Sequence, residues 1–241
     1  MTHRFYAMPE SFRDDRVLLD RGETRHLRDV LRLDVGANVI VFDGCGREFS
    51  CTVTAMRKAE TELLVISEQP AASPESALEI TLAAAMLKGE KFDLVVQKAV
   101  ELGVRRLIAL NTIRCDVKIK ESTKRIDRWR KIALEASKQS GRAQLMEVSG
   151  PVEFDTFIDD LHSGGTAVMF AEREGDRLPD KIESTSIIAI VGPEGGWDDS
   201  ELSAARDHDI AIVTFGGRVM RAETAAITVA AILQHRFGDI N

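Results

Sequence analysis

Residues 186–201, SIIAIVGPEGGWDDSE, decide the fold because an apolar run ends there in a glycine turn that leads into a helix start. The run over residues 186–192 predicts a strand buried on both faces, which is typical of a parallel sheet covered by helices. The glycines that follow let backbone approach a ligand closely, and Asp198 or Asp199 can cap the next helix. Ligands bind such sheets just beyond the carboxyl ends of the strands, so the turn is a candidate binding site. A plain strand-to-helix connection would look the same.

A second turn of the same kind follows one strand later. Residues 210–215 predict a strand, Gly216 and Gly217 break it, and residues 223–236 predict a helix. Two glycine turns at the ends of two strands indicate one shared pocket, walled by backbone and apolar side chains. Neither turn has the GxxxxGK[ST] pattern that cradles triphosphates or the GxGxxG pattern of dinucleotide sites. The pocket therefore suits a ligand with an adenine ring and no phosphate.

The chain changes its pattern at the stretch QPAASPES, residues 69–76, whose prolines and small polar residues predict a linker. After it, apolar runs alternate with helical patterns, which predicts an α/β domain with a mostly parallel sheet over residues 77–241. Before it, short alternating runs around the turn at 43–46 predict a small β-barrel over residues 1–70, and residues 71–76 join the two domains.

The predicted elements follow from apolar periodicity and from the glycines that end them. Strands are predicted at 39–42, 48–55, 62–67, 80–88, 105–110, 166–171, 186–192 and 210–215. Helices are predicted at 23–32, 91–102, 124–140, 152–161, 199–208 and 223–236.

Composition narrows the class of protein. The 241 residues are 44% hydrophobic and 29% charged, and no apolar run approaches the roughly 18 residues of a membrane helix. The N-terminus has charges where a signal peptide needs an apolar region, so a cytoplasmic location is expected. The three cysteines lack CxxC spacing and the five histidines are scattered, so neither a disulfide framework nor a metal site is predicted.

Charge is distributed unevenly along the chain. The formal net charge is −7, yet residues 105–142 hold twelve Lys/Arg against four Asp/Glu. Residues 143–241 hold seven against eighteen. Because a polyanion responds to the local field, a nucleic-acid partner fits this distribution despite the acidic total. A solvated basic helix accounts for the same stretch equally well.

Two helical segments carry the basic residues that could contact phosphates. In the first, four arginines spaced four, three and four apart share one predicted helix face: Arg21, Arg25, Arg28 and Arg32. The remaining apolar positions are predicted to face a core: Leu27, Val30 and Leu31. In the second, the outer face of the helix over 124–140 holds Lys124, Arg125, Arg128 and Lys131. Because acidic residues lie beside the arginines of the first segment, the alternative is that this face is only solvated and does not contact phosphates.

Four motifs occur in an order that is specific in combination: VVQKAVELGV (95–104), EASKQSGR (135–142), VGPEGGW with SE (191–201), and GRVMRAETA (217–225). Together they resemble the ribosomal RNA small subunit methyltransferase E family of the SPOUT superfamily. The N-terminal half matches the family more weakly, at HRFYA (3–7), His26 and the Gly44–Gly46 hairpin. With these matches the resemblance covers nearly the whole chain. Trp197 departs from it, because a phenylalanine is common there, and the segment after Arg142 lacks a proline.

The resemblance implies a fold and an activity. The larger domain is expected to be an α/β trefoil knot, and the smaller one a PUA-like β-barrel that binds RNA. The implied reaction is methylation of N-3 of a uridine in the decoding region of 16S ribosomal RNA, with S-adenosylmethionine as cofactor and no metal. The implied partners are 16S ribosomal RNA or the small ribosomal subunit and a second copy of the chain, with no membrane.

The resemblance also implies site residues. The cofactor is expected among three loops, at Phe170, Ala171, Gly192, Pro193, Glu194, Gly195, Gly196, Phe215, Gly216, Val219, Met220 and Ala225. RNA contacts are expected on the two basic helical segments and at the N-terminal matches to the family, namely Arg4, Arg25, His26, Arg28, Arg32, Lys124 and Arg128.

The implied chemistry needs a proton acceptor. Adenosylmethionine carries its own leaving group, so neither a metal nor a covalent intermediate is required. The uridine imide must lose its proton, and Glu223 or Glu194 is a candidate base, while Arg142 or Arg221 could stabilise the uracil oxygen. An Arg221–Glu223 ion pair that only fixes the loop is the alternative. Ribose 2′-O methylation and a non-catalytic RNA-binding module are the alternative functions, and a nucleotide triphosphatase is disfavoured.

Overall fold

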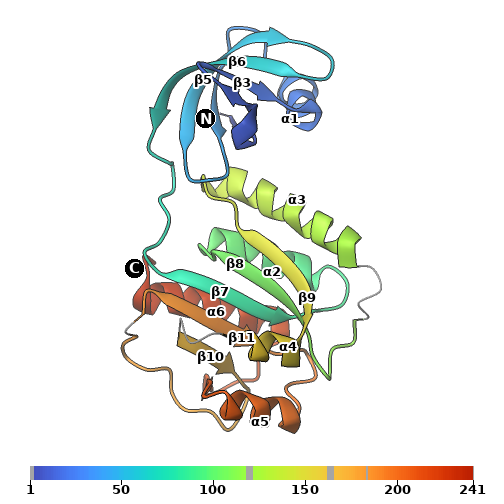
Figure 1. The fold of residues 1–241 in the computed structure, drawn as a ribbon, viewed down its shortest axis with the longest axis vertical. Helices are drawn as coiled ribbons and strands as arrows, with labels where there is room; N and C mark the ends of the chain where they lie inside the picture. The colour runs from blue at the N-terminus through green and yellow to red at the C-terminus, as the bar shows by residue number, and fades with distance from the viewer. Residues whose placement is uncertain (1–2, 118–121, 162–165, 183, 241) are drawn as a thin grey trace. The chain divides into compact units, whose positions relative to one another are not determined.

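The chain folds into two compact units. The computed structural model describes residues 3–117, 122–161, 166–182 and 184–240 (Figure 1), so residues 118–121 of the basic stretch lie outside the described ranges. Met1–Glu75 and Ser137–Leu145 form the first unit, which we call the N-terminal unit. Ser76–Ala136 and Met146–Asn241 form the second, which we call the sheet unit.

The sheet unit is built on six strands in the order β12-β10-β11-β7-β8-β9, and every neighbouring pair is parallel. The strands are β7 (Glu79–Ala85), β8 (Arg106–Asn111), β9 (Glu147–Glu153), β10 (Thr166–Phe170), β11 (Ser186–Val191) and β12 (Ala211–Val213). Their apolar runs are buried on both faces, as expected for a parallel sheet between helical layers.

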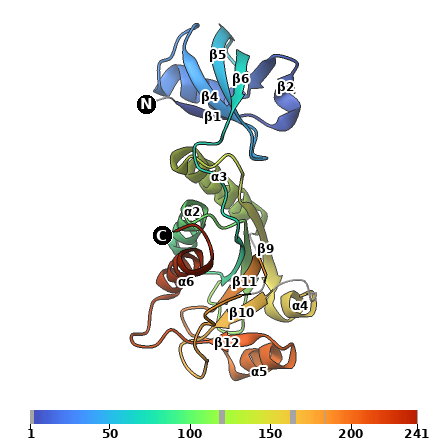
Figure 2. The ribbon, with the colours of Figure 1, turned by 90° about the vertical axis from the view of Figure 1, so that its left-hand side faces the viewer.

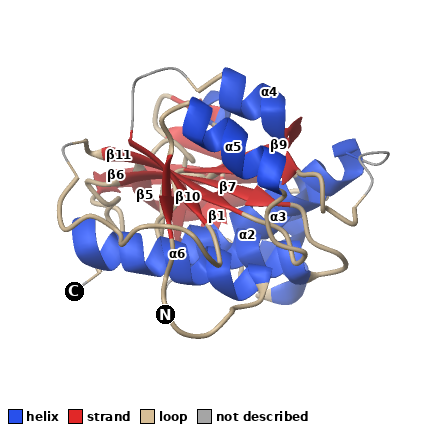
Figure 3. Ribbon diagram, turned by 90° about the horizontal axis from the view of Figure 1, so that it is seen from below, coloured by secondary structure: helices blue, strands red, loops and turns tan. Residues whose placement is uncertain are grey.

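Helices cover both faces of this sheet (Figure 3). One face packs against α2 (Lys91–Glu101), α6 (Ala222–Phe237) and the sheet-unit part of α3 (Ser122–Ser140). The other face packs against α4 (Phe154–Asp159) and α5 (Asp199–Asp207). The side-by-side packing of α2 and α6 is visible in Figure 2.

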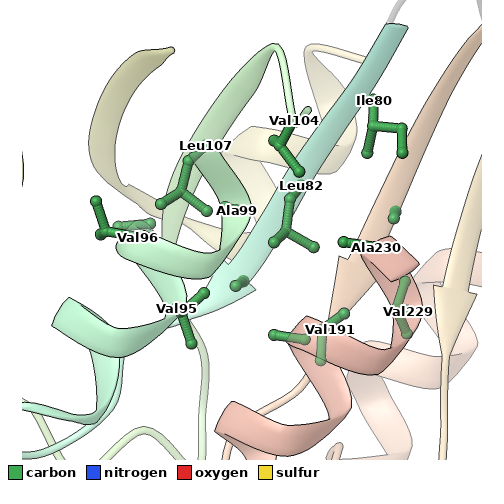
Figure 4. Packing of buried hydrophobic residues seen from close by; sticks show 14 of the residues in the cluster. Ile80, Leu82, Val95, Val96, Ala99, Val104, Leu107, Val191, Val229 and Ala230 are labelled. Carbon is green, nitrogen blue, oxygen red and sulfur yellow. The ribbon is translucent and has the colours of Figure 1, made fainter. Parts of the chain in front are cut away.

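The larger core lies between the sheet and the α2–α6 layer (Figure 4). Val95, Val96 and Ala99 are spaced to share one face of α2, and all are buried. From β7, Leu82 joins them, and Val229 contributes from α6. This packing fixes α6 against the sheet, so its first turn is held beside the loops that follow the strands.

The N-terminal unit contains a six-stranded mixed sheet in the order β1-β4-β5-β6-β3-β2. The strands are β1 (Arg4–Tyr6), β2 (Phe12–Arg13), β3 (Arg16–Leu19), β4 (Asn38–Phe42), β5 (Glu48–Met56) and β6 (Thr61–Gln69). β1 is parallel to β4 and the other pairs are antiparallel, with bulges between β5 and β6 that bend the ladder. The sheet forms a half-barrel around one buried apolar cluster.

The segment after α3 belongs to the N-terminal unit, where it pairs with the hairpin between β4 and β5. The Gly46 amide donates to the Ala143 carbonyl at 3.2 Å, and the Leu145 amide donates to the Gly44 carbonyl at 3.0 Å. Gly44 has a φ of +77°, which favours glycine. The hairpin and the distant segment therefore form one structure.

The structure corrects the helix predicted over residues 152–161. Residues up to Glu153 form β9, and the helix is confined to α4, Phe154–Asp159. Pro151 cannot donate a backbone hydrogen bond, but β9 is the edge strand of its sheet, where proline is tolerated. β1, β2 and β3 were not predicted, because they are too short to show a clear alternation.

The helix predicted over residues 23–32 is also different from expectation. It consists of α1 (Arg21–Arg25) followed directly by a π-helical turn (His26–Val30), and a separate short 3₁₀ helix lies earlier in the chain, at Pro9–Ser11. The Leu31 amide donates to the His26 carbonyl five residues back, which changes the angular spacing of the side chains. Val30 is therefore 64% exposed instead of buried, and Arg32, at φ +54°, lies outside the shared helix face. Of the described helices, none has both the length and the apolar composition to span a bilayer.

Candidate cofactor pocket and nearby charged residues

A pocket of about 750 Å³, partly open to solvent, lies where three loops meet in the sheet unit. β10 sits between β11 and β12, so the loops that follow these strands share one edge of the sheet. The lining residues come from these loops and from α6: Phe170, Ala171, Glu172, Val191, Gly192, Pro193, Glu194, Gly196, Trp197, Phe215, Gly217, Arg218, Val219, Met220, Ala222, Ala225 and Val229.

Trp197 fixes the loop after β11. Its indole Nε1 donates to the Phe170 carbonyl at 2.9 Å, and its ring packs on Phe154 with centroids 5.2 Å apart. Gly192 runs so close beneath the indole that an added Cβ would lie 2.8 Å from it. Gly192 is therefore required by the tryptophan, whereas Gly196 is required by its own φ of +72°.

The same loop ends in the helix cap that the sequence predicted. Asp198 caps α5 in a capping box with Glu201, whose other carboxylate oxygen accepts from the Ile113 amide at 2.9 Å. Hydrogen bonds from Ser200, together with nearby Arg114, hold the pKa of Asp198 below its ordinary value. The entry to α5 is thus tied to the segment after β8.

Two cations from distant segments hold the loop after β11. Lys91, at the start of α2, forms an ion pair with Glu194. Arg114 donates to the Gly195 carbonyl at 3.3 Å and pairs with Asp198 at 3.2 Å. Sequence reasoning missed both contacts, because they join positions 103 and 81 or more residues apart without a local signal.

The second glycine loop, between β12 and α6, is more open. Phe215 packs on Phe170 with ring centroids 5.1 Å apart. An added Cβ at Gly216 or Gly217 would meet no atom within 4 Å, and the side chain of Val219 is 68% exposed. The loop therefore presents free surface beside a pocket wall that is fixed by aromatic packing.

Ten of the twelve residues predicted to contact the cofactor line this pocket. The two that do not are Gly195, which lies against Arg114, and Gly216. Sequence reasoning missed seven lining residues: Glu172, Val191, Trp197, Gly217, Arg218, Ala222 and Val229. Most of these residues adjoin predicted positions, because the ends of the strands could be located from the sequence. Which side chains point into the pocket could not be predicted.

The predicted catalytic residues fall in different surroundings. Glu223 lies in the first turn of α6, and within the described part of the chain its buried Oε2 atom has no hydrogen-bond partner. No Arg221–Glu223 ion pair occurs among the described residues, and Arg221 is exposed. Arg142 is buried in the N-terminal unit, where its Nε and Nη2 donate to the two oxygens of Glu75 at 3.0 and 2.6 Å.

The residues predicted to contact RNA are only partly free to do so. Arg4 pairs with Glu48 and donates to the Arg142 carbonyl at 3.2 Å, so it stabilises the N-terminal unit. Arg28 pairs with Asp29 at 2.7 Å, and Arg128 pairs with Asp93. The His26 ring packs on Phe5, and the remaining predicted residues are exposed: Arg25, Arg32 and Lys124.

Comparison with known proteins connects this geometry to a family. Residues 74–234 match the family model of an RNA methyltransferase domain, and residues 19–64 match that of an RNA methyltransferase PUA domain. The sheet unit thus carries the fold of an RNA methyltransferase. Ribosomal RNA small subunit methyltransferase E of Synechocystis is 31% identical over 238 residues, which are 96% of this chain and 77% of that protein. The chain belongs to the ribosomal RNA small subunit methyltransferase E family.

Solved structures agree with this assignment. A ribosomal RNA small subunit methyltransferase E from Neisseria gonorrhoeae, bound to S-adenosyl methionine, has a TM-score of 0.91 at 32% identity. A methyltransferase from Legionella pneumophila, in complex with the same cofactor, has a TM-score of 0.90 at 32% identity. Each comparison covers 100% of both chains, so the likeness includes the N-terminal half-barrel.

Proposed function

We propose that this protein methylates N-3 of one uridine in 16S ribosomal RNA, with S-adenosylmethionine as methyl donor. The observation that carries the proposal is the pocket of aromatic rings and glycine loops, whose lining residue Ala222 precedes Glu223 in the chain; the buried Oε2 atom of Glu223 has no hydrogen-bond partner among the described residues. A homodimer in the cytoplasm, acting on the decoding region of the small subunit, is part of the same proposal.

The pocket fits the cofactor by its chemistry. It is partly open and is walled mostly by apolar and aromatic side chains, which is typical of small-molecule sites. The lining combines three aromatic rings, Phe170, Trp197 and Phe215, with the backbone of glycine loops, and Arg218 is the one basic residue among its described members. Rings and backbone groups suit an adenine nucleoside with a sulfonium, which supplies an activated methyl group.

The chain's own residues would handle the acceptor's proton. Among the described residues the Oε2 atom of Glu223 has no donor, and a buried acceptor without a donor is costly, so this atom is suited to take a hydrogen bond or a proton from the uracil imide. Arg221, exposed one residue before α6, is suited to stabilise the uracil oxygen that becomes negative. Glu194 is engaged with Lys91, so we assign it to holding the loop. Arg142 is engaged with Glu75, so we assign it to positioning the segment after α3.

The test is to incubate the protein with methyl-labelled adenosylmethionine and small ribosomal subunits that lack the modification. We expect label on one uridine, at the base nitrogen, after digestion to nucleosides. Label on a ribose oxygen would favour 2′-O methylation instead. Failure to bind adenosylmethionine in calorimetry would favour a non-catalytic RNA-binding module.

A further inference from the structure

A second hollow lies on the other side of the loop between β12 and α6. It contains about 1490 Å³ of space, partly open to solvent, and shares three residues with the cofactor pocket, namely Phe215, Arg218 and Met220. The loop is therefore a wall with a different hollow on each side. A molecule bound in the second hollow would therefore contact side chains that also line the cofactor pocket.

The walls of this hollow are fixed by the fold. The segment that carries Arg177 is tied to the end of β12, because the Gly175 amide donates to the Thr214 hydroxyl at 2.9 Å and the Thr214 amide donates to the Asp176 carbonyl at 3.0 Å. The opposite wall is one face of α6, whose residues recur every four positions: Thr228, Ile232 and Arg236.

Cations dominate the lining. Three arginines, Arg177, Arg218 and Arg236, face a single acid, Asp180, which pairs with Arg236 at 2.7 Å. No ion pair within the described residues engages Arg177 or Arg218, and both are exposed. Two guanidinium groups are thus available to an anion, and guanidinium binds phosphate with two parallel hydrogen bonds.

Apolar residues and two threonines complete the lining. Phe215 and Met220 stand on the loop, and Ile232 on α6 is partly buried against the core. A ring and aliphatic side chains beside arginines form the combination that accepts single-stranded nucleotides, with the base on the apolar wall and the phosphate on the cations.

We propose that this hollow binds a nucleotide of the RNA strand next to the methylated one, with its phosphate on Arg177 and Arg218. The inference rests on the proposed function, because it places the flanking nucleotide one loop away from the cofactor pocket. With the nucleotide bound in this way, the loop between β12 and α6 would lie between the reacting base and the neighbouring nucleotide.

The experiment measures the binding of a short uridine-containing single-stranded RNA by fluorescence anisotropy at several salt concentrations. We expect Arg177→Gln to weaken binding several-fold and to lower the slope of log affinity against log salt by about one. Arg177→Lys keeps the charge and should keep the slope. Arg173→Gln is the matched control, since Arg173 is an exposed arginine of the same segment outside the hollow.

Two results would overturn the inference. Wild-type affinity and slope in Arg177→Gln would show that no phosphate binds there. A change of sedimentation in Arg177→Glu, with RNA binding unchanged, would assign the hollow to contact between copies of the chain. Neither result depends on turnover, whereas the proposed function is tested on the wild-type protein by methyl transfer, so the two failures are distinguishable.

Discussion

At the scale of single residues, Trp197 connects the structural core to the pocket. In Trp197→Phe a ring can still pack on Phe154, but the buried Phe170 carbonyl loses its donor. We expect the free energy of unfolding to fall by about 1–3 kcal/mol and adenosylmethionine binding to weaken. Denaturant titration and calorimetry measure the two effects.

Trp129→Phe is the matched control for this prediction. Its indole donates to Asp93 at 3.1 Å, away from the pocket lining. The control should lose stability and keep cofactor affinity. Unchanged affinity in Trp197→Phe would show that the Phe170 carbonyl does not position the pocket wall.

Glu223 is the second prediction at this scale. Glu223→Gln keeps the shape of the side chain and removes its ability to take a proton. We expect methyl transfer to slow by about 10²-fold or more, with adenosylmethionine affinity near that of wild type. Single-turnover kinetics measures the first and calorimetry the second. Glu172→Gln, at an exposed carboxylate of the pocket lining, is the control, and equal rates in the two variants would reject Glu223 as the base.

At the scale of elements, α5 depends on the buried carboxylate of Glu201. One oxygen accepts from the Asp198 amide and the other from the Ile113 amide, both at 2.9 Å. Glu201→Gln replaces one acceptor by a donor and leaves a buried N–H unpaired. We expect a loss of about 1–3 kcal/mol in the free energy of unfolding, measured by denaturant titration. Asp199→Asn, exposed in the same turn, should cost less than about 1 kcal/mol, and equal losses would contradict the prediction.

At the scale of the whole molecule, RNA affinity should depend on the position of the positive charges in the chain and not only on the net charge. We expect Arg25→Glu with Arg28→Glu to weaken RNA binding and reduce its salt dependence, while adenosylmethionine affinity stays the same. Arg173→Glu with Arg206→Glu changes the net charge equally within the acidic part of the chain and is the control. Anisotropy measures the RNA affinity of both double variants. If both lose affinity equally, Arg25 and Arg28 belong to a solvated helix face and do not contact RNA.

The sequence predicted the elements that repeat a clear pattern. Each buried strand after the linker was recognised except β9, because a continuous apolar run is a local signal. The position of the pocket followed from the two runs that end in glycine turns. The π-helical turn at His26–Val30 was not predictable, since one extra residue per turn leaves the composition unchanged and moves every later side chain. The trefoil knot implied by the resemblance stays a prediction.

Charge partners could not be predicted, because they are chosen by the fold. Glu194 suggested a base by its place in the glycine turn, yet Lys91 pairs with it from the start of α2. Arg142 suggested a substrate contact by its place in a polar motif, yet it is buried against Glu75. The chemistry of a side chain near a motif limits the roles that this side chain can take. Its ion-pair partner in the folded protein decides which of these roles it has.

The return of Ser137–Leu145 to the N-terminal unit bears on synthesis. Translation releases Met1–Glu75 first, but the half-barrel then lacks the segment that pairs with its β4–β5 hairpin. Lys138, which forms an ion pair with Glu23, is made only after residues 76–136 of the sheet unit. The half-barrel is therefore expected to mature in two stages during translation. A gene fragment that stops after the linker would encode an incomplete unit.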